Sequence, residues 1–285
     1  MQVIRAHAMG MCFGVRDALA AVARVPDPAE VTIHGELVHN QEVVRGLALR
    51  GFRMSGELER SRVPDTPLVL VTAHGVSDAE RERLRSAGKR LIDTTCPLVA
   101  RVHDAARSLA SEGYHVLLIG RRGHVEVEGI TGDLERFDVL ESPEEVRTYS
   151  APRLGVVSQT TSAPPDVEKV LRAVEAHNPH AEIRFIDTVC QPTKDRQQAL
   201  EDLLAAVDAV VVVGGANSNN THRLADRCRR SGVPVHLVQT AADLEAAWFR
   251  DYSRVGLTAG TSTLDETIAS VHAALLRMGE EPASA

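Results

Sequence analysis

The sequence contains few residues of several kinds that mark common protein classes. Aromatic residues make up 3% of its 285 residues, cysteine occurs only four times, and only three of its 32 basic residues are lysines. The formal net charge is −7, which excludes a protein that binds nucleic acid or a membrane surface through an overall basic charge. We attribute the scarcity of lysine to genome base composition rather than to function.

Long hydrophobic runs are also absent. No apolar run reaches the length of a membrane span, and the first residues lack the pattern of a signal peptide. We therefore expect a cytoplasmic protein with no membrane partner. In a reducing compartment cysteines bind metals or take part in catalysis more often than they form disulfides.

What the chain does contain is a regular alternation of apolar, β-branched runs with polar loops and helix-like stretches. This order is typical of α/β folds with parallel sheets. The nearly continuous run "AVVVVGG" predicts a strand buried on both faces. The other predicted strands are "VTIHG", "LVLVTAHG", "HVLLIG", "RLGVVSQ", "PVHLV" and "RVGLTAG", and two of the predicted helices are "DAERERLRSAG" and "APPDVEKVLRAVEAH".

Three of the four cysteines recur at intervals of about one third of the chain. Cys12, Cys96 and Cys190 are separated by 84 and 94 residues, and the last two share the pattern Asp-Thr-X-Cys. Cys228 differs because it lies among arginines in a helix-like stretch. We infer three αβ modules, over residues 1–95, 96–189 and 190–285, each with one cysteine near a common centre. The alternative is three unrelated buried thiols, since cysteine is often a small core residue.

Neutral or switchable hydrogen-bonding residues follow most of the predicted strands, where ligands bind in parallel α/β sheets. Such loops can bind phosphate through side chains, backbone N–H groups and helix dipoles, although a single Ser, Thr or Asn is also an ordinary helix cap. The chain lacks a Walker lysine motif and a dinucleotide fingerprint, which favours a small phosphorylated ligand over a nucleotide. The loops offer His34, His39, Asn40, His74, Ser77, His124, Glu126, Glu128, Thr160, Thr161, Ser218, Asn219, Asn220, Thr261, Ser262 and Thr263.

The cysteine spacing also indicates the kind of metal centre. Structural zinc sites usually use ligand pairs at short spacing, and this chain has no Cys-X-X-Cys pair. Iron–sulfur clusters are held by thiolates that can lie far apart in the sequence. Three cysteines on a cubane cluster would leave one of four irons open for catalysis. In "GMCFGV" the glycines would let the backbone approach such a cluster, with Cys12 as one ligand.

The chain resembles the 4-hydroxy-3-methylbut-2-enyl diphosphate reductase (LytB) family. The resemblance rests on nine motifs in order, namely "GMCFGV", "HGELVHN", "AHGVS", "DTTCPLV", "GHVEVEG", "SQTTS", "TKDRQ" after a cysteine, "GGANSNN" and "TAGTS". It implies three αβ modules around a central 4Fe–4S cluster with one iron not bound by cysteine. It also implies removal of the substrate's hydroxyl as water, with two electrons and two protons, to give isopentenyl and dimethylallyl diphosphate. The electrons would come from a donor such as ferredoxin or flavodoxin.

The same resemblance assigns roles to individual residues. Glu126 would be the acid, and Thr160 would contact the substrate and relay the proton. The cluster ligands would be Cys12, Cys96 and Cys190. The diphosphate would be bound by His39, His74, His124, Ser218, Asn220 and Ser262, with Asn219 at a position where the family usually has serine.

The stretch "GHVEVEG" allows two interpretations of Glu126. On an extended segment residues two apart point the same way, so His124 and Glu126 would face one pocket while Val125 and Val127 pack behind. Alternatively, Glu126 is a carboxylate at a helix N-terminus that only stabilises the helix.

Four further positions depart from the family's usual residues. They are Phe13, Val125, Asn219 and Leu264. They leave open a divergent paralogue that acts on a related allylic phosphate. A non-catalytic sensor that carries a cluster is a second alternative, but it would not need a carboxyl group at position 126.

Overall fold

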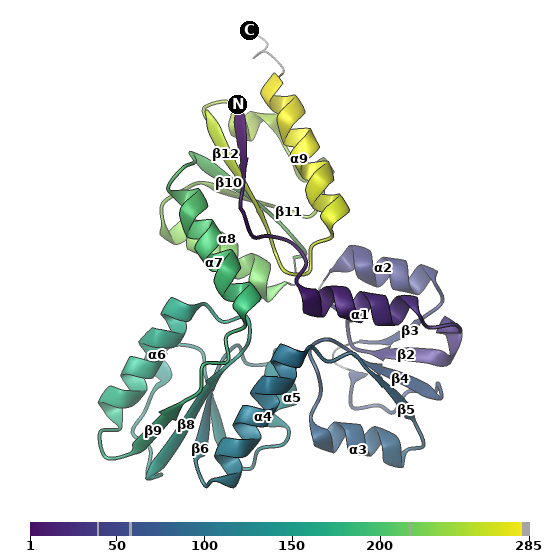
Figure 1. Cartoon of the computed structure of the whole chain (residues 1–285), viewed down its shortest axis with the longest axis vertical. Coiled ribbons are helices and arrows are strands. Elements are labelled where there is room, and N and C mark those ends of the chain that lie inside the picture. Colours follow the sequence, from purple (N-terminus) through teal and green to yellow (C-terminus); the bar gives the residue numbers. More distant parts are fainter. Residues whose placement is uncertain (39, 57–58, 217, 281–285) are drawn as a thin grey trace. The chain divides into compact units, whose positions relative to one another are not determined.

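The structure of the chain is a computed structural model that describes residues 1–38, 40–56, 59–216 and 218–280 (Figure 1). Within these residues, the strands form three four-stranded sheets, and every neighbouring pair of strands is parallel. The predicted α/β class with three parallel-sheet modules is therefore confirmed. None of the described helices is both long and apolar enough to cross a membrane.

The chain divides into two compact units, each of which is described by itself. The terminal unit comprises the described residues of 1–13, 39–41 and 191–285, and the central unit comprises those of 14–38 and 42–190. The terminal unit contains one sheet and the central unit contains two.

The sheet of the terminal unit has the strand order β1-β12-β10-β11. In its register Val211 of β10 pairs with Leu257 of β12. Its elements are β1 (Gln2–Arg5), α7 (Gln191–Leu204), β10 (Ala209–Val213), α8 (Asn219–Arg230), β11 (Val235–Val238), β12 (Arg254–Ala259) and α9 (Asp265–Glu280).

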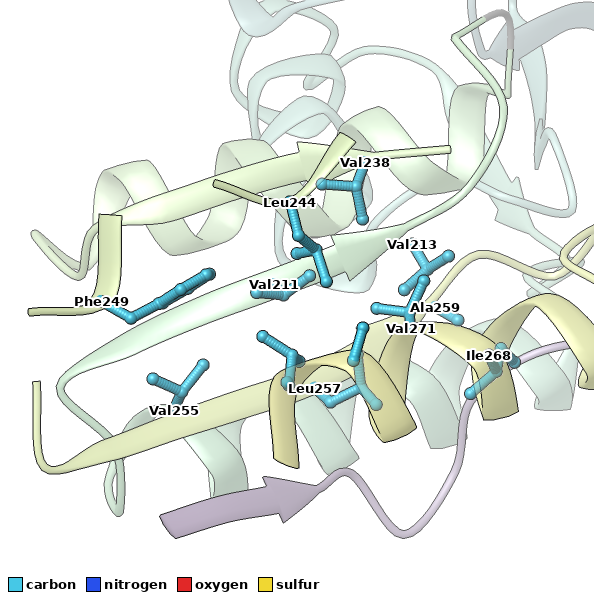
Figure 2. Close-up of a cluster of buried hydrophobic side chains, with 12 residues drawn as sticks. Val211, Val213, Val238, Leu244, Phe249, Val255, Leu257, Ala259, Ile268 and Val271 are labelled. Carbon is cyan, nitrogen blue, oxygen red and sulfur yellow. The ribbon is translucent and has the colours of Figure 1, made fainter. Parts of the chain in front are cut away.

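Strand β10 is buried along its whole length, as the valine run predicts. Alternate residues face opposite sides of a strand. Val211 and Val213 pack in a cluster with Val271 of α9, as Figure 2 shows. Val210 and Val212 belong to a second cluster with residues of α7 and α8. Both faces of the sheet are thus covered by helices, and the loops at the carboxyl ends of its strands are left to carry functional residues.

The first sheet of the central unit has the order β3-β2-β4-β5. Figure 1 shows α1 and α2 on one side of this sheet and α3 on the other. Its elements are α1 (Phe13–Ala23), β2 (Val31–His34), α2 (Gln41–Leu49), β3 (Arg53–Ser55), β4 (Leu68–Val71), α3 (Asp78–Ser86) and β5 (Arg90–Asp93).

The second sheet of the central unit has the order β7-β6-β8-β9. Residues of α4 and α5 share one apolar cluster with β6 and β8, and residues of α6 share another with the opposite face. Its elements are α4 (Pro97–Ser111), β6 (His115–Ile119), α5 (Val125–Thr131), β7 (Phe137–Leu140), β8 (Arg153–Ser158), α6 (Pro164–His177) and β9 (Glu182–Phe185).

The N-terminal strand joins a sheet from the far end of the sequence. Residues 2–5 pair with β12, so β1 is an edge strand of the sheet that the last third of the chain builds. The division into modules 1–95, 96–189 and 190–285 remains a prediction. The pairing places the first residues of the predicted module 1–95 in the sheet of the terminal unit, whose other strands come from the last third of the chain.

Candidate active site

Each of the three regularly spaced cysteines stands directly before a helix. Cys12 precedes α1, Cys96 precedes α4 and Cys190 precedes α7. The unpaired amides and the dipole of a helix N-terminus stabilise a negative charge such as a thiolate. Cys228 lies inside α8, where burial raises the pKa of its thiol to about 12. None of the four forms a disulfide. The first three positions are suited to thiolate ligands, whereas Cys228 is not.

The turn that carries Cys96 lies against the start of α1. A Cβ atom on Gly14 would stand 2.5 Å from the Sγ atom of Cys96, so a side chain at this position would displace the thiol. The Cys96 N–H donates to the carbonyl of Ala73, at 3.0 Å. The backbone of Cys96 is therefore bound to the segment that follows β4, and its thiol lies against Gly14 at the start of α1.

A partly exposed network around Arg81 holds the residues just before Cys96. Arg81 donates from Nε to Asp93, at 3.0 Å, and from Nη2 to the hydroxyl of Thr95, at 3.1 Å. The backbone N–H of Thr95 also donates to Asp93, at 2.9 Å. Burial alone would raise the pKa of Asp93, but the hydrogen bonds from Thr95 and Arg81 outweigh it and hold that pKa below its ordinary value. The turn between β5 and α4 is thereby fixed from its side chains as well as its backbone.

Thr160 connects Glu126 to the turn that carries Cys190. Its backbone N–H donates to Oε1 of Glu126, at 2.7 Å, and its hydroxyl donates to Oε2, at 2.9 Å. Its carbonyl accepts the backbone N–H of Cys190, at 3.0 Å. Glu126 is only 2% exposed. A single residue, Thr160, thus joins this buried carboxyl group to the backbone of a candidate metal ligand through hydrogen bonds.

His74 and His124 face each other within the central unit. Their ring centroids are 5.8 Å apart, with an interplanar angle of 83°. His124 is the N-cap of α5, and its Nδ1 accepts the backbone N–H of Glu126, at 3.1 Å. An Nδ1 that accepts carries no proton, so in the neutral ring the proton is on Nε2. His124 is therefore a donor through Nε2.

The extended conformation predicted for this segment is wrong. Residues 125–131 form helix α5, and Glu126 lies in its first turn, as in the alternative interpretation. Val125 and Val127 are buried, as predicted, and Glu128 is exposed. The helix position does not make Glu126 a surface carboxylate, because Thr160 covers both of its oxygens.

In the terminal unit the predicted phosphate-binding residues meet at the loop after β12. Ser218 caps α8, and its hydroxyl is 3.5 Å from that of Ser262. The Oδ1 atom of Asn220 accepts the backbone N–H of Thr261, at 3.0 Å. Asn40 donates from Nδ2 to the carbonyl of Ser262, at 2.7 Å. These contacts bring Ser218, Asn220 and Ser262 together.

The turn that carries Cys12 is bound to the same loop. Its backbone N–H donates to the carbonyl of Thr261, at 3.4 Å, and the N–H of Gly10 donates to Ala259, at 3.2 Å. Gly10 has a φ of 74°, which favours glycine. Within the terminal unit, one loop thus holds a candidate metal ligand and candidate phosphate ligands.

The predicted site residues are distributed over both units. His39 lies outside the described residues, and Asn219 begins α8 with a side chain that is likewise outside them. The central unit contains Cys96, Cys190, His74, His124, Glu126 and Thr160, and the terminal unit contains Cys12, Ser218, Asn220 and Ser262.

Sequence reasoning offered one residue that points elsewhere and did not single out several that organise the site. His34 is fully buried and bonds to Glu80, and burial lowers its pKa. Arg81 and Thr95 carried no motif-level signal, because arginines and threonines are frequent throughout the chain. Asn40 was among the loop residues that the sequence offered but was given no role, and the structure shows that it donates to the carbonyl of Ser262.

Cys12, Cys96 and Cys190 offer thiols, which are the ligands that iron–sulfur clusters use. Among the described residues, no group of three or more His, Cys, Asp or Glu side chains could hold a metal ion. A cluster takes its thiolates on different irons, so its ligands are spread apart. Three thiols at helix N-termini, with Gly14 packed on the Sγ atom of Cys96, suit such a group.

Comparison with known proteins identifies the family. The model of the LytB protein family matches residues 3–276. The chain belongs to the LytB protein family. LytB reductase homologues imply an iron–sulfur cluster, in agreement with the cysteine positions.

The relatives and solved structures that the chain resembles are named as diphosphate reductases. The 4-hydroxy-3-methylbut-2-enyl diphosphate reductase of Acinetobacter baumannii is 36% identical over 281 residues, covering 95% of this chain and 88% of that protein. The structure of the E-1-hydroxy-2-methyl-but-2-enyl-4-diphosphate reductase from Plasmodium falciparum has a TM-score of 0.88 and 26% identity, covering 99% of this chain and 89% of that one. A structure named (E)-4-hydroxy-3-methyl-but-2-enyl diphosphate reductase, the terminal enzyme of the non-mevalonate pathway, has a TM-score of 0.68 and 31% identity, covering 97% and 100%.

Proposed function

We propose that this LytB protein is a 4Fe–4S-dependent reductase that removes the hydroxyl of 4-hydroxy-3-methylbut-2-enyl diphosphate. The reaction consumes two electrons and two protons, breaks the allylic C–O bond, releases water and yields isopentenyl and dimethylallyl diphosphate. The names of its relatives support the reaction. The observation that carries the proposal is the buried Glu126, whose two oxygens are held by Thr160, itself bonded to the Cys190 turn.

We assign Cys12, Cys96 and Cys190 as the three thiolate ligands. Their shared position before a helix supports this assignment, and the raised pKa of Cys228 argues against the fourth cysteine. Gly14 contacts Cys96 and follows Cys12 by two residues, so the chain cannot separate the Cα atoms of Cys12 and Gly14 by more than ~7 Å. When bound, a cluster with one iron free of cysteine supplies electrons and a Lewis-acid position for the substrate oxygen.

Glu126 holds the proton that leaves with the substrate hydroxyl. Its Oε1 accepts a backbone N–H, which cannot reverse direction, so Oε1 stays unprotonated. Its Oε2 faces the Thr160 hydroxyl, which can rotate from donor to acceptor. The transferable proton is therefore on Oε2, and the Thr160 hydroxyl relays it. Hydroxide is a poor leaving group, so this proton is what makes C–O cleavage feasible at neutral pH.

The diphosphate is bound by neutral donors and histidines. His124 donates from Nε2 because its Nδ1 is occupied by the N–H of Glu126. Donors at helix N-termini suit a dianionic group without lysine. The remaining members of this set are His39, His74, Ser218, Asn219, Asn220 and Ser262. A donor such as ferredoxin or flavodoxin supplies the electrons.

The test is anaerobic turnover of 4-hydroxy-3-methylbut-2-enyl diphosphate by reconstituted protein with a chemical reductant. We expect brown protein with broad absorbance at about 400 nm and formation of both products. Serine at position 12, 96 or 190 should remove bound iron and turnover, whereas Cys228→Ser should retain both. Colourless reconstituted protein, or iron lost from Cys228→Ser but not from Cys12→Ser, would contradict the ligand assignment.

Two departures from the family favour a second candidate, a paralogue with a related allylic phosphate as substrate. Asn219 and Leu264 lie beside the candidate phosphate-binding residues in sequence. Brown, cluster-containing protein that fails to turn over the family substrate but reduces another allylic alcohol phosphate would favour the paralogue. Protein that binds a cluster and turns over neither would favour a sensor.

A further inference from the structure

Arg196 is a buried cation outside the set of site residues. It lies on α7, six residues after Cys190, and is 6% exposed. A charged side chain is rarely buried this far unless strong hydrogen bonds hold it. Its hydrogen bonds therefore indicate what it does.

The guanidinium of Arg196 binds two backbone carbonyls. Nε and Nη2 both donate to the carbonyl of Gly10, at 3.1 and 2.5 Å, and Nη1 donates to that of Pro192, at 2.8 Å. Gly10 is two residues before Cys12, and Pro192 is two residues after Cys190. One side chain thus bonds to the segments next to two proposed cluster ligands.

The contact with Gly10 completes the anchoring of the Cys12 turn. The amide side of this turn is held by β12 and its loop, through Gly10 N–H to Ala259 and Cys12 N–H to Thr261. The second of these bonds is long, at 3.4 Å. The carbonyl side is held by Arg196. Among the bonds within the described residues, loss of the guanidinium leaves the turn its two amide-side bonds, one of them weak.

The geometry requires arginine rather than another cation. Two nitrogens converge on one carbonyl while a third reaches a different carbonyl, which matches the planar fork of a guanidinium. A lysine offers a single nitrogen in place of these three. A glutamine can donate to one carbonyl but carries no charge.

We propose that Arg196 is a positioning residue that fixes the Cys12 turn so that its thiolate is held for the cluster. This rests on the proposed role of Cys12 as a ligand. Groups that orient metal ligands typically change metal affinity by about 10–100-fold when they are removed. Arg196→Gln should therefore release iron about 10–100-fold faster to a chelator, and Arg196→Lys should lie between it and the wild type.

The matched control is Arg227→Gln. Arg227 also ties α7, through Nη2 to Glu201 at 2.6 Å, but within the described part of the chain it makes no hydrogen bond to either cysteine segment. We expect its iron release to stay within about twofold of the wild type. Thermal unfolding of the cluster-free full chain reports any general loss of stability in each variant.

A second readout separates positioning from folding. In the cluster-free full chain, alkylation of each cysteine is followed by mass spectrometry. Arg196→Gln should speed modification of Cys12, with Cys228 still protected. Iron release equal to that of Arg227→Gln, or equal acceleration at all four cysteines, would overturn the proposal. If Cys12→Ser retains its iron, the ligand assignment itself fails. If Cys12→Ser loses iron while Arg196→Gln does not, only the role of Arg196 fails.

Discussion

Replacement of Glu126 by glutamine separates proton donation from packing. In the structure the carboxyl group accepts one hydrogen bond from the backbone N–H of Thr160 and one from its hydroxyl. A glutamine can keep both, with its carbonyl toward the N–H and its NH₂ donating to the rotated hydroxyl. The cost to the free energy of unfolding should therefore be no more than about 1 kcal/mol, the net worth of one hydrogen bond.

The kinetic effect should be much larger than this structural cost. An amide cannot supply an acidic proton, and general acid catalysis is typically worth about 10²–10⁴-fold in rate. That range corresponds to about 2.7–5.4 kcal/mol of activation free energy. We expect Glu126→Gln to retain its cluster and near-normal substrate binding, and to lose turnover by this factor.

The assay is anaerobic steady-state turnover at matched iron content, with thermal unfolding of each variant. Glu128→Gln is the control, because Glu128 is an exposed carboxylate on the same helix, and its turnover should stay within about twofold. Thr160→Val keeps the backbone bond to Oε1 but removes the relay, so it should slow turnover less than Glu126→Gln. Wild-type turnover in Glu126→Gln would remove this residue from the mechanism.

Three further predictions concern binding and stability. Ser262→Ala should weaken substrate binding about 10–100-fold, as expected for one lost hydrogen bond to a charged group, and equal KM values for variant and wild type would place the diphosphate elsewhere. Asn219→Ser should bind the family substrate as well as or better than the wild type, whereas lower activity on the protein's true substrate would favour the paralogue. The pKa of Asp93 is lowered in the folded state, so its stabilisation is present above the unfolded pKa of about 3.9 and is lost as the pH falls through the folded value. Chemical denaturation should accordingly show a stability gap between wild type and Asp93→Asn that shrinks below about pH 4, and a gap independent of pH would be inconsistent with this origin.

The central strands were predictable because they are buried on both faces. Each long apolar run in the sequence corresponds to a strand of the structure: the central strands β2, β4, β6, β8, β10 and β12, and the partly buried edge strand β11. The strands without such a signal are short edge strands that contain both exposed and partly buried residues, such as β5 and β9. An edge strand has a neighbour on one side only, so its sequence need not be continuously apolar.

Helix α5 shows why local pattern can mislead. The alternation Val125-Glu126-Val127-Glu128 has the period of a strand, and the predicted extended segment followed from it. Val127 and Ile130 are both buried, at the i, i+3 spacing of a helix face, and His124 caps the first turn. Tertiary packing and the His124 cap therefore make these seven residues helical, although the alternation of valine and glutamate has the period of a strand.

The loop after β12 links the proposed metal ligand Cys12 to the proposed phosphate-binding residues of the terminal unit. Its Thr261 carbonyl accepts the N–H of Cys12, and its Ser262 stands beside Ser218. Asn220 and Asn40 each bind the loop backbone, so its position depends on two amide side chains. Leu264, where the family usually has proline, lies beyond these contacts, and its carbonyl accepts a helical N–H of α9. The backbone that presents Ser262 is therefore held without the proline, and the consequence of this departure falls on the start of α9 rather than on the ligands.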